Sequence, residues 1–126
     1  MMNLIAIFIG GGIGAMLRYI ISTMAKHFFM FTIVGTFISN IIGCFLIGFL
    51  FALTLNKAGM LPDYLKALLI VGFLGGLTTF STFNIEIFEL IKNGKIFYGL
   101  IYMVSSCVVG LLVTYLGYMF FSKTSL

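Results

Sequence analysis

The sequence contains few charged residues: seven Lys and Arg, three Asp and Glu, and one His among 126 residues. Only 8% of the residues are charged whereas 62% are hydrophobic, and the mean hydropathy is +1.24. A water-soluble domain needs a polar surface, and a chain with so few polar residues cannot form one. The composition therefore predicts an integral membrane protein. The scattered Lys and Arg residues form no basic stripe of the kind that binds nucleic acid.

Side chains suited to catalysis are almost absent. The only histidine, His27, is expected in a loop, and the carboxylates Asp63, Glu86 and Glu89 are expected at or beyond the ends of the apolar segments. Ser81 has no base near it in the sequence, so a nucleophile–base pair is not supported. Metal-ligand clusters and phosphate-binding loops are also missing from the sequence. We therefore predict that the protein is not an enzyme.

Tryptophan is absent, and cysteine and proline are rare. Cys44 and Cys107 lie within apolar segments and are interpreted as packing residues, not as a disulfide. The single proline, Pro62, falls between two apolar segments, where a break is expected. Because no Pro/Ser-rich linker or charge run divides the chain, residues 1–126 are predicted to form one domain.

Long apolar segments dominate the sequence. A transmembrane helix needs about 20 apolar residues to cross roughly 30 Å of hydrocarbon. Three segments carry no charge, and one further segment contains only Arg18. We therefore predict an all-α protein with four transmembrane helices, at about 3–25, 30–55, 65–89 and 96–121, joined by loops near 26–29, 56–65 and 90–95.

The lysines give no preferred orientation in the membrane. With four spans, three lysines lie on the side of the termini and three on the other: Lys57, Lys66 and Lys123 against Lys26, Lys92 and Lys95. Since Lys and Arg in loops set orientation, a tie leaves two readings open. Either the chain inserts both ways and pairs antiparallel, or other features select one orientation. Arg18 also has two readings, an extension to the interface or the attraction of anions into an aqueous vestibule.

Small residues recur at four-residue spacing and predict close helix packing. Gly10 and Gly14 form one GxxxG pattern, Gly72 and Gly76 form another, and a similar row runs along the second span at residues 35, 39 and 43. Small residues let helix backbones approach closely within the membrane.

The segment GGLTTFSTF at residues 75–83 is unusually polar for the middle of a span. Two glycines followed by two threonines favour a break, and a break at this depth must be buried in protein or line a polar cavity. Backbone carbonyls freed by the break could bind a small hard cation such as Na⁺. The alternative is an intact helix whose hydroxyl groups bond to the preceding turn, and periodicity alone slightly favours it.

Several uncharged side chains could interact with an anion at membrane depth. Phe80 and Phe83 share a helical face, and the edge of a phenyl ring carries partial positive charge. Asn40, Tyr102 and Ser106 can donate hydrogen bonds. Each could equally be a packing residue, but together they suggest an uncharged path rich in donors, with weak sites in series as conduction requires.

Three motifs resemble the Fluc/CrcB family of bacterial fluoride channels along essentially the whole chain: GGGIGAMLRY at 10–19, GTFISNIIGCFLIG at 35–48 and GFLGGLTTFSTF at 72–83. The resemblance implies a dual-topology homodimer of four-helix subunits joined antiparallel, with the third helix broken near its centre. It also implies a structural Na⁺, which is not transported, bound at the dimer centre by the backbone carbonyls of Gly75 and Thr78.

The same resemblance assigns pathway residues. The family's pore phenylalanines match Phe80 and Phe83, its pore asparagine matches Asn40, and its polar track matches Tyr102 and Ser106. Ser81 and Thr82 are expected to be hydroxyl donors nearby. A further hydroxyl of that track would fall at Gly110, which has none, so the far end of the track departs from the family pattern.

The implied function is passive export of fluoride across the bacterial cytoplasmic membrane, which lowers its intracellular concentration and toxicity. The alternative is a small dual-topology drug/proton antiporter. Such proteins use a membrane-embedded Glu in the first helix and a Trp in the binding site, whereas this sequence has no acidic residue before Asp63 and no Trp.

Overall fold

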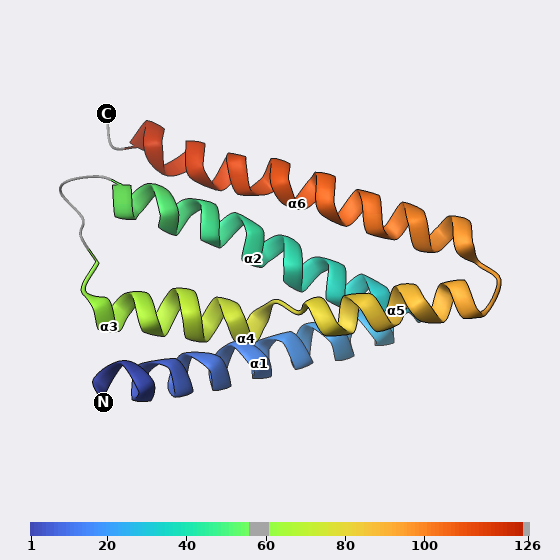
Figure 1. Cartoon of the computed structure of the whole chain (residues 1–126), viewed down its shortest axis with the longest axis horizontal. Coiled ribbons are helices and arrows are strands. Elements are labelled where there is room, and N and C mark those ends of the chain that lie inside the picture. The colour runs from blue at the N-terminus through green and yellow to red at the C-terminus, as the bar shows by residue number, and fades with distance from the viewer. Residues whose placement is uncertain (56–60, 125–126) are drawn as a thin grey trace.

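The structure, a computed structural model, describes residues 1–55 and 61–124, and all secondary structure in these residues is helical. Four helical segments lie side by side (Figure 1). Each is long and apolar enough to cross a membrane, as predicted. The first two are α1 (Met2–Phe29) and α2 (Thr32–Leu55), and the last is α6 (Ile96–Thr124). The third is composed of four pieces: α3 (Asp63–Lys66), π-helical η1 (Ala67–Leu74), α4 (Gly75–Leu77) and α5 (Phe80–Lys92).

The connection between α1 and α2 differs from the sequence prediction. Helix α1 does not end before residue 26 but continues to Phe29, so His27 lies in its last turn and not in a loop. Met30 ends the helix in the left-handed conformation, with φ 61°, and its N–H bonds the Lys26 carbonyl. The predicted loop at 26–29 is therefore wrong, because a single left-handed residue closes the helix and lets α2 begin at Thr32.

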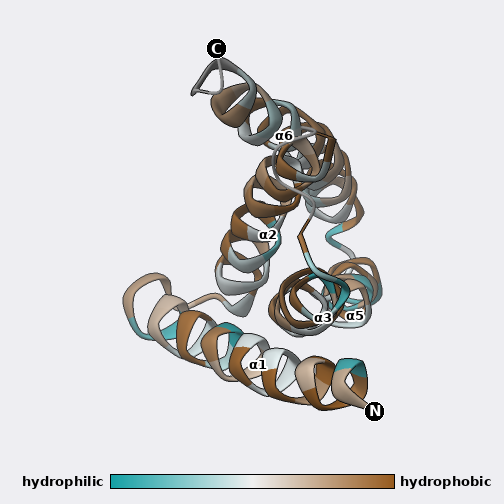
Figure 2. Ribbon diagram, turned by 90° about the vertical axis from the view of Figure 1, so that its left-hand side faces the viewer, coloured by the Kyte–Doolittle hydropathy of each residue, from teal (hydrophilic) through white to brown (hydrophobic). Residues whose placement is uncertain are grey.

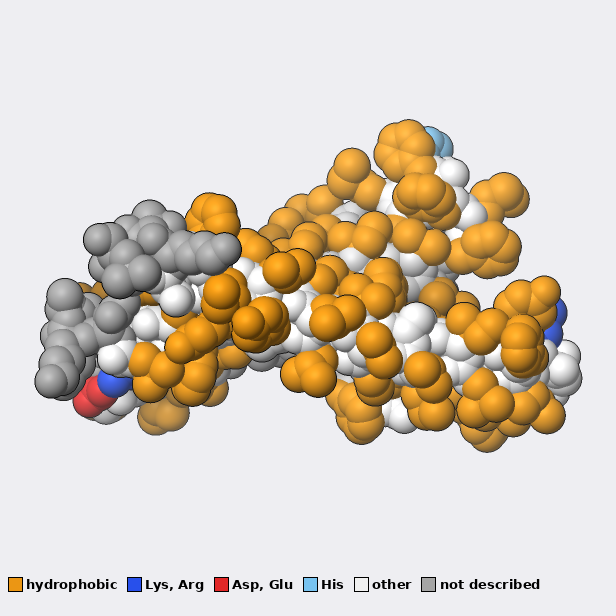
Figure 3. All heavy atoms as spheres, turned by 90° about the horizontal axis from the view of Figure 1, so that it is seen from above, with side chains coloured by type: hydrophobic (Ala, Val, Ile, Leu, Met, Phe, Trp, Pro, Cys, Tyr) orange, Lys and Arg blue, Asp and Glu red, His pale blue; other side chains and the backbone are white. Residues whose placement is uncertain are grey.

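The outer surface is apolar, as a membrane protein requires. Large side chains such as Phe8 and Leu111 are 82% and 74% exposed. Hydrophobic residues are found along all four helical segments (Figure 2), and they cover most of the face in Figure 3, where Lys, Arg, Asp and Glu appear only near the two ends. This distribution suits contact with lipid along the helices and with water at their ends.

The described lysines lie at both ends of the helices. The start of α1, the end of α6 and the short helix α3, which carries Lys66, lie at one end of the molecule (Figure 1). Lys26, Lys92 and Lys95 lie at or near the turns at the opposite end. Lys57 falls outside the described residues, as does the side chain of Lys123. The positions of the described lysines agree with the predicted division between two sides.

The two predicted GxxxG patterns, in α1 and in the third span, pack against each other. A Cβ added at Gly14 would overlap the Phe73 carbonyl oxygen, and one added at Gly76 would overlap that of Gly11. Gly10 and Gly72 face the opposite backbone in the same way. Helix α1 therefore lies backbone to backbone with η1 and α4, and this contact supports the segment that precedes the break in the third span.

Replacing Gly14 with Ala should destabilise the fold by about 1–3 kcal/mol, because the added methyl group must displace backbone. Gly12→Ala is the matched control, since a Cβ there meets nothing within 4 Å. The measurement is equilibrium unfolding in detergent micelles, with helicity as the signal. Equal stability of the two variants would show that the backbones of α1 and η1 do not approach closely at Gly14.

Candidate functional site

The third span breaks at Thr78 and Thr79. Both residues are extended, with φ −86° and ψ 156° at Thr78 and φ −150° and ψ 122° at Thr79. Thr78 Oγ1 donates to the Leu74 carbonyl at 2.9 Å, which is the back-bond expected for an intact helix, yet the helix ends there. Thr79 then caps α5, because its hydroxyl oxygen accepts from the N–H of Thr82 at 3.2 Å. The predicted break is confirmed, and the intact helix that periodicity favoured is wrong.

Asn40 of α2 holds the break open. Its Oδ1 accepts from the Thr79 N–H at 2.8 Å, and its Nδ2 donates to the Thr79 carbonyl at 3.2 Å. In a continuous helix the Thr79 N–H would bond the Gly75 carbonyl, and the Thr82 N–H would bond that of Thr78. Both N–H groups are instead bonded to side chains. The carbonyls of Gly75 and Thr78 have therefore lost their helical partners.

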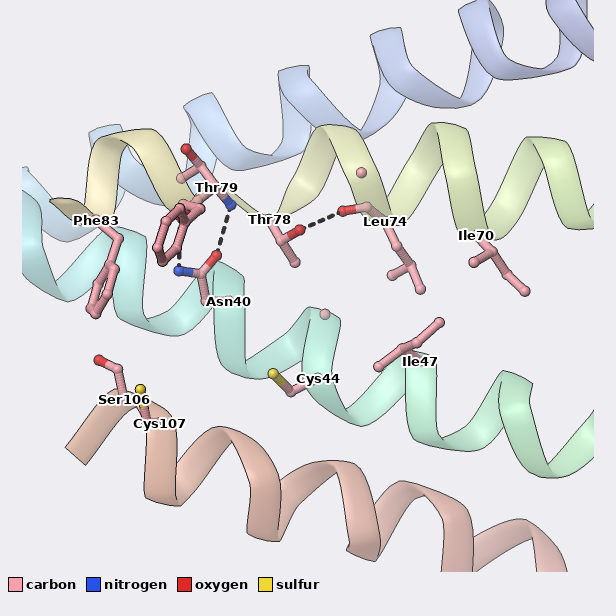
Figure 4. A pocket seen from close by; sticks show the side chains of 13 residues that line it. Asn40, Cys44, Ile47, Ile70, Leu74, Thr78, Thr79, Phe83, Ser106 and Cys107 are labelled. Atoms are coloured by element: carbon pink, nitrogen blue, oxygen red, sulfur yellow. Dashed lines mark hydrogen bonds between the residues drawn. The ribbon is translucent and has the colours of Figure 1, made fainter. Parts of the chain in front are cut away.

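A cavity of about 490 Å³ opens beside the break (Figure 4). It brings together six of the predicted site residues: Asn40, Gly75, Thr78, Phe80, Phe83 and Ser106. The rest of the lining is Gly43, Cys44, Ile47, Ile70, Leu74, Thr79 and Cys107. None of these lining residues is charged, so an anion in the cavity would meet hydrogen-bond donors and ring edges but no fixed cation.

Three aromatic rings follow one another from the cavity. The ring centroids of Phe80 and Phe83 are 6.1 Å apart. Phe83 packs edge to face on Tyr102, with ring centroids 5.0 Å apart and an angle of 65° between the ring planes. Phe80 is 76% exposed whereas Phe83 and Tyr102 are each 7% exposed. Tyr102 does not line the cavity but packs behind Phe83. The aromatic side chains thus connect the open cavity with the packed space between α5 and α6.

Glu86 corrects a sequence interpretation. It was expected at or beyond the end of its span, but it lies within α5 and is only 5% exposed. Thr36 Oγ1 donates to one carboxylate oxygen at 2.8 Å, and the Tyr102 hydroxyl donates to the other at 2.9 Å. A buried carboxylate is tolerated when it is hydrogen-bonded in this way. The missed signal was helical spacing, because Glu86 is three residues after Phe83 and Thr36 is four before Asn40.

The remaining predicted residues lie at different distances from the cavity. Ser81 is exposed, with its Oγ 3.3 Å from Thr79 Oγ1, and Thr82 Oγ1 accepts from the same hydroxyl at 3.1 Å. Neither lines the cavity, and half-buried Arg18 on α1 does not line it either. The Ser106 hydroxyl oxygen is buried and has no hydrogen-bond partner in the described residues.

Both cysteines are free, as predicted. The sequence suggested that both cysteines are packing residues. Cys44 is half-buried, but Cys107 is exposed and does not pack in the interior of the chain. Apolar sequence did not distinguish the two because the residues of a membrane helix are apolar on both its packed and its outer face.

Comparison with known proteins identifies the family. Residues 5–118 match the family described as CrcB-like protein, Camphor Resistance (CrcB). The chain is 43% identical over 114 residues to fluoride-specific ion channel FluC of Aquifex aeolicus (strain VF5), covering 90% of this chain and 91% of that protein. It is 42% identical over 116 residues to FluC 1 of Staphylococcus aureus (strain NCTC 8325 / PS 47), with 92% and 93% covered. A third relative, FluC 2 of Staphylococcus saprophyticus, is 39% identical over 124 residues, which cover 98% of this chain and 100% of that protein. The chain therefore belongs to the CrcB family.

Proposed function

We propose that this protein is a fluoride channel that lets fluoride leave the cell passively across the cytoplasmic membrane. The uncharged cavity beside the helix break is the observation that carries the proposal, since its lining combines an amide, hydroxyl groups and two phenyl rings. The names of the relatives, fluoride-specific ion channels, support fluoride as the ion. The inside-negative membrane potential would drive the anion outward without a coupled reaction.

The proposed route follows the polar and aromatic groups. Asn40 uses one of its two amide hydrogens for the Thr79 carbonyl, so the second remains for an anion. Phe80 and Phe83 would present electropositive ring edges, which attract a small anion more weakly than a lysine would. Ser106 would donate from its buried hydroxyl. Such weak contacts in series favour entry without trapping, as conduction requires.

We assign the other predicted residues to the surroundings of this route. Tyr102 uses its hydroxyl hydrogen for Glu86, so it positions the Phe83 ring that it contacts. Ser81 and Thr82 supply hydroxyl groups at the start of α5. Arg18 would attract anions to the approach of the route, because a cation outside the cavity raises the local anion concentration without binding in the path.

The functional unit in this proposal is an antiparallel homodimer. The start of α5 exposes Ser81 and Asn84, and Gly75 of α4 is exposed as well, with nothing within 4 Å of a Cβ added there. Polar side chains and irregular backbone at membrane depth require protein or a polar cavity around them and not lipid. A second copy placed over this face would provide that cover.

The Gly75 and Thr78 carbonyls suit a structural Na⁺. Both have lost their helical partners, and hard cations prefer oxygen ligands. One subunit offers only two such carbonyls, so the site would need the same pair from a second copy. The bound cation would supply fixed positive charge between the two breaks and hold them together.

Removal of Na⁺ and similar cations should therefore abolish fluoride flux. Thr78→Ser should largely preserve cation dependence, since it keeps the carbonyl and the hydroxyl bonded to Leu74 and loses only the methyl group that faces Gly43. Gly75→Leu should weaken it, because bulk would enter the open face. The measurement is fluoride efflux against Na⁺ concentration, and unchanged flux after thorough cation removal would contradict the site.

The proposed function itself is tested with purified protein in liposomes. Fluoride-loaded vesicles should release fluoride when a potassium ionophore relieves the charge imbalance, and chloride-loaded vesicles should release far less chloride. Release that requires a pH gradient, or that is equal for chloride and fluoride, would contradict a passive fluoride-specific channel. Protein-free liposomes provide the baseline.

A further inference from the structure

A row of hydroxyl groups on α6 has one gap. Tyr102, Ser106, Gly110 and Thr114 follow one another at four-residue spacing and so lie along one face of the helix. Three of the four carry a hydroxyl group, whereas Gly110 carries no side chain. Thr114 uses its hydroxyl hydrogen for the Gly110 carbonyl at 2.9 Å. Two side chains of α6 line the cavity, the Ser106 hydroxyl and the Cys107 thiol, and in the described residues no hydroxyl group of α6 beyond Ser106 lines it.

The gap at Gly110 is occupied by Cys44 of α2. A Cβ added at Gly110 would lie 3.3 Å from the Cys44 sulfur, closer than an ordinary van der Waals contact. Gly110 is buried and Cys44 is half-buried. In Figure 4 the Cys44 side chain lies between α2 and α6. The sulfur thus stands next to the place where a side chain of α6 would begin.

Cys44 also lines the cavity, together with Asn40 one turn earlier and Ile47 about one turn later on α2. Along the cavity in Figure 4, Cys44 follows Asn40 and precedes the aliphatic residues Ile47 and Ile70. It is therefore the last of the α2 side chains lining the cavity that can donate a hydrogen bond. A thiol S–H is a weak donor and a small apolar group at once.

The buried Ser106 hydroxyl lies at the Phe83 end of the same cavity and is available to a ligand there. Its oxygen has no partner among the described residues, and Figure 4 shows it directed toward Phe83. A buried hydroxyl without a partner costs free energy, so the Ser106 hydroxyl has a hydrogen to offer to an acceptor that enters the cavity. Ser106 and Cys44 line the same cavity, from facing helices.

We propose that the Cys44 thiol continues the row of donors at Gly110 and is a contact of the fluoride route beyond Ser106. This inference rests on the proposed function. A weak S–H donor at this point would give the anion one more contact between Ser106 and the aliphatic part of the cavity. Because the contact is weak, it would not hold the anion strongly.

The test compares Cys44→Ala with Cys44→Ser, which differ mainly by a donor group. Loss of one hydrogen-bond donor should lower fluoride efflux about threefold to tenfold in Cys44→Ala. Cys44→Ser should keep the wild-type rate or exceed it. A purely packing role predicts equal losses for both variants, because both are smaller than Cys. Wild-type flux in Cys44→Ala, or equal losses in the two variants, would overturn the proposal.

A rescue gives a second readout. Gly110→Ser alone would press against the sulfur, but in combination with Cys44→Ala it places a hydroxyl in the vacated space, and the double variant should recover most of the lost flux.

If Cys44→Ala does not fold, methyl methanethiosulfonate can cap the thiol in a folded Cys107→Ala protein, and flux should fall relative to the same protein before treatment. Complete capping by mass with unchanged flux would contradict the role. If wild-type protein releases no fluoride, the proposed function fails as well, whereas wild-type transport with insensitive Cys44 variants rejects this inference alone.

Discussion

Replacing Phe83 with Ile should lower fluoride efflux by about tenfold, since a ring contact is worth roughly 0.5–1.5 kcal/mol beyond buried area. Ile keeps an apolar side chain but removes the electropositive ring edge. Phe80→Ile should have a similar effect although Phe80 is 76% exposed in the single chain and Phe83 only 7%. Similar losses at two positions that differ so much in burial would point to the ring edge and not to packing. The measurement is the initial rate of fluoride release from liposomes.

Two phenylalanines outside the cavity serve as controls. Phe88 and Phe97 are 57% and 72% exposed, and neither lines the cavity. Phe→Ile at these positions should leave flux near the wild-type rate. Phe83→Met is a milder test, because a polarisable thioether could replace part of the ring contact. Normal flux in well-folded Phe80→Ile and Phe83→Ile proteins would show that the two rings are packing residues and that the fluoride route does not pass them.

Forcing the chain into a single orientation should abolish transport. Several lysines appended at the C-terminus would hold that end, with the N-terminus and Lys66, on the cytoplasmic side. Only half of an antiparallel pair would then be available. The measurement is fluoride resistance of cells, or flux after purification, when this variant is expressed alone.

The matching control places the added lysines at the opposite end, in the turn between α5 and α6 beside Lys92 and Lys95. This variant should also be inactive alone, and coexpression of the two should restore transport. Appending the same number of glutamates at the C-terminus should change little, because acidic residues have a weak effect on orientation. Full activity from a population shown to have one orientation would rule out the antiparallel dimer.

Much of the fold follows from local sequence. Uncharged segments long enough to cross the bilayer predict four spans, and the helices in the structure correspond to them within a few residues at most ends. The largest difference is at α1, which continues through His27 because a left-handed Met30 can end it with no Gly or Pro to signal the turn. The glycine patterns also predicted a real contact, since Gly14 and Gly76 leave room for the facing backbone whatever the remaining side chains are.

The sequence by itself determined the membrane environment, the four spans and the polar segment at which the third one could break. Only the tertiary structure decided that it does break there, because the Thr79 N–H bonds Asn40, 39 residues away, in place of the preceding turn. In the same way Glu86 is buried through Thr36, 50 residues away, and Cys44 is placed beside Gly110 by the packing of α2 on α6. Periodicity records which face of a helix is apolar, but the choice among hydrogen-bond partners depends on which groups from distant parts of the chain the fold brings within about 3 Å.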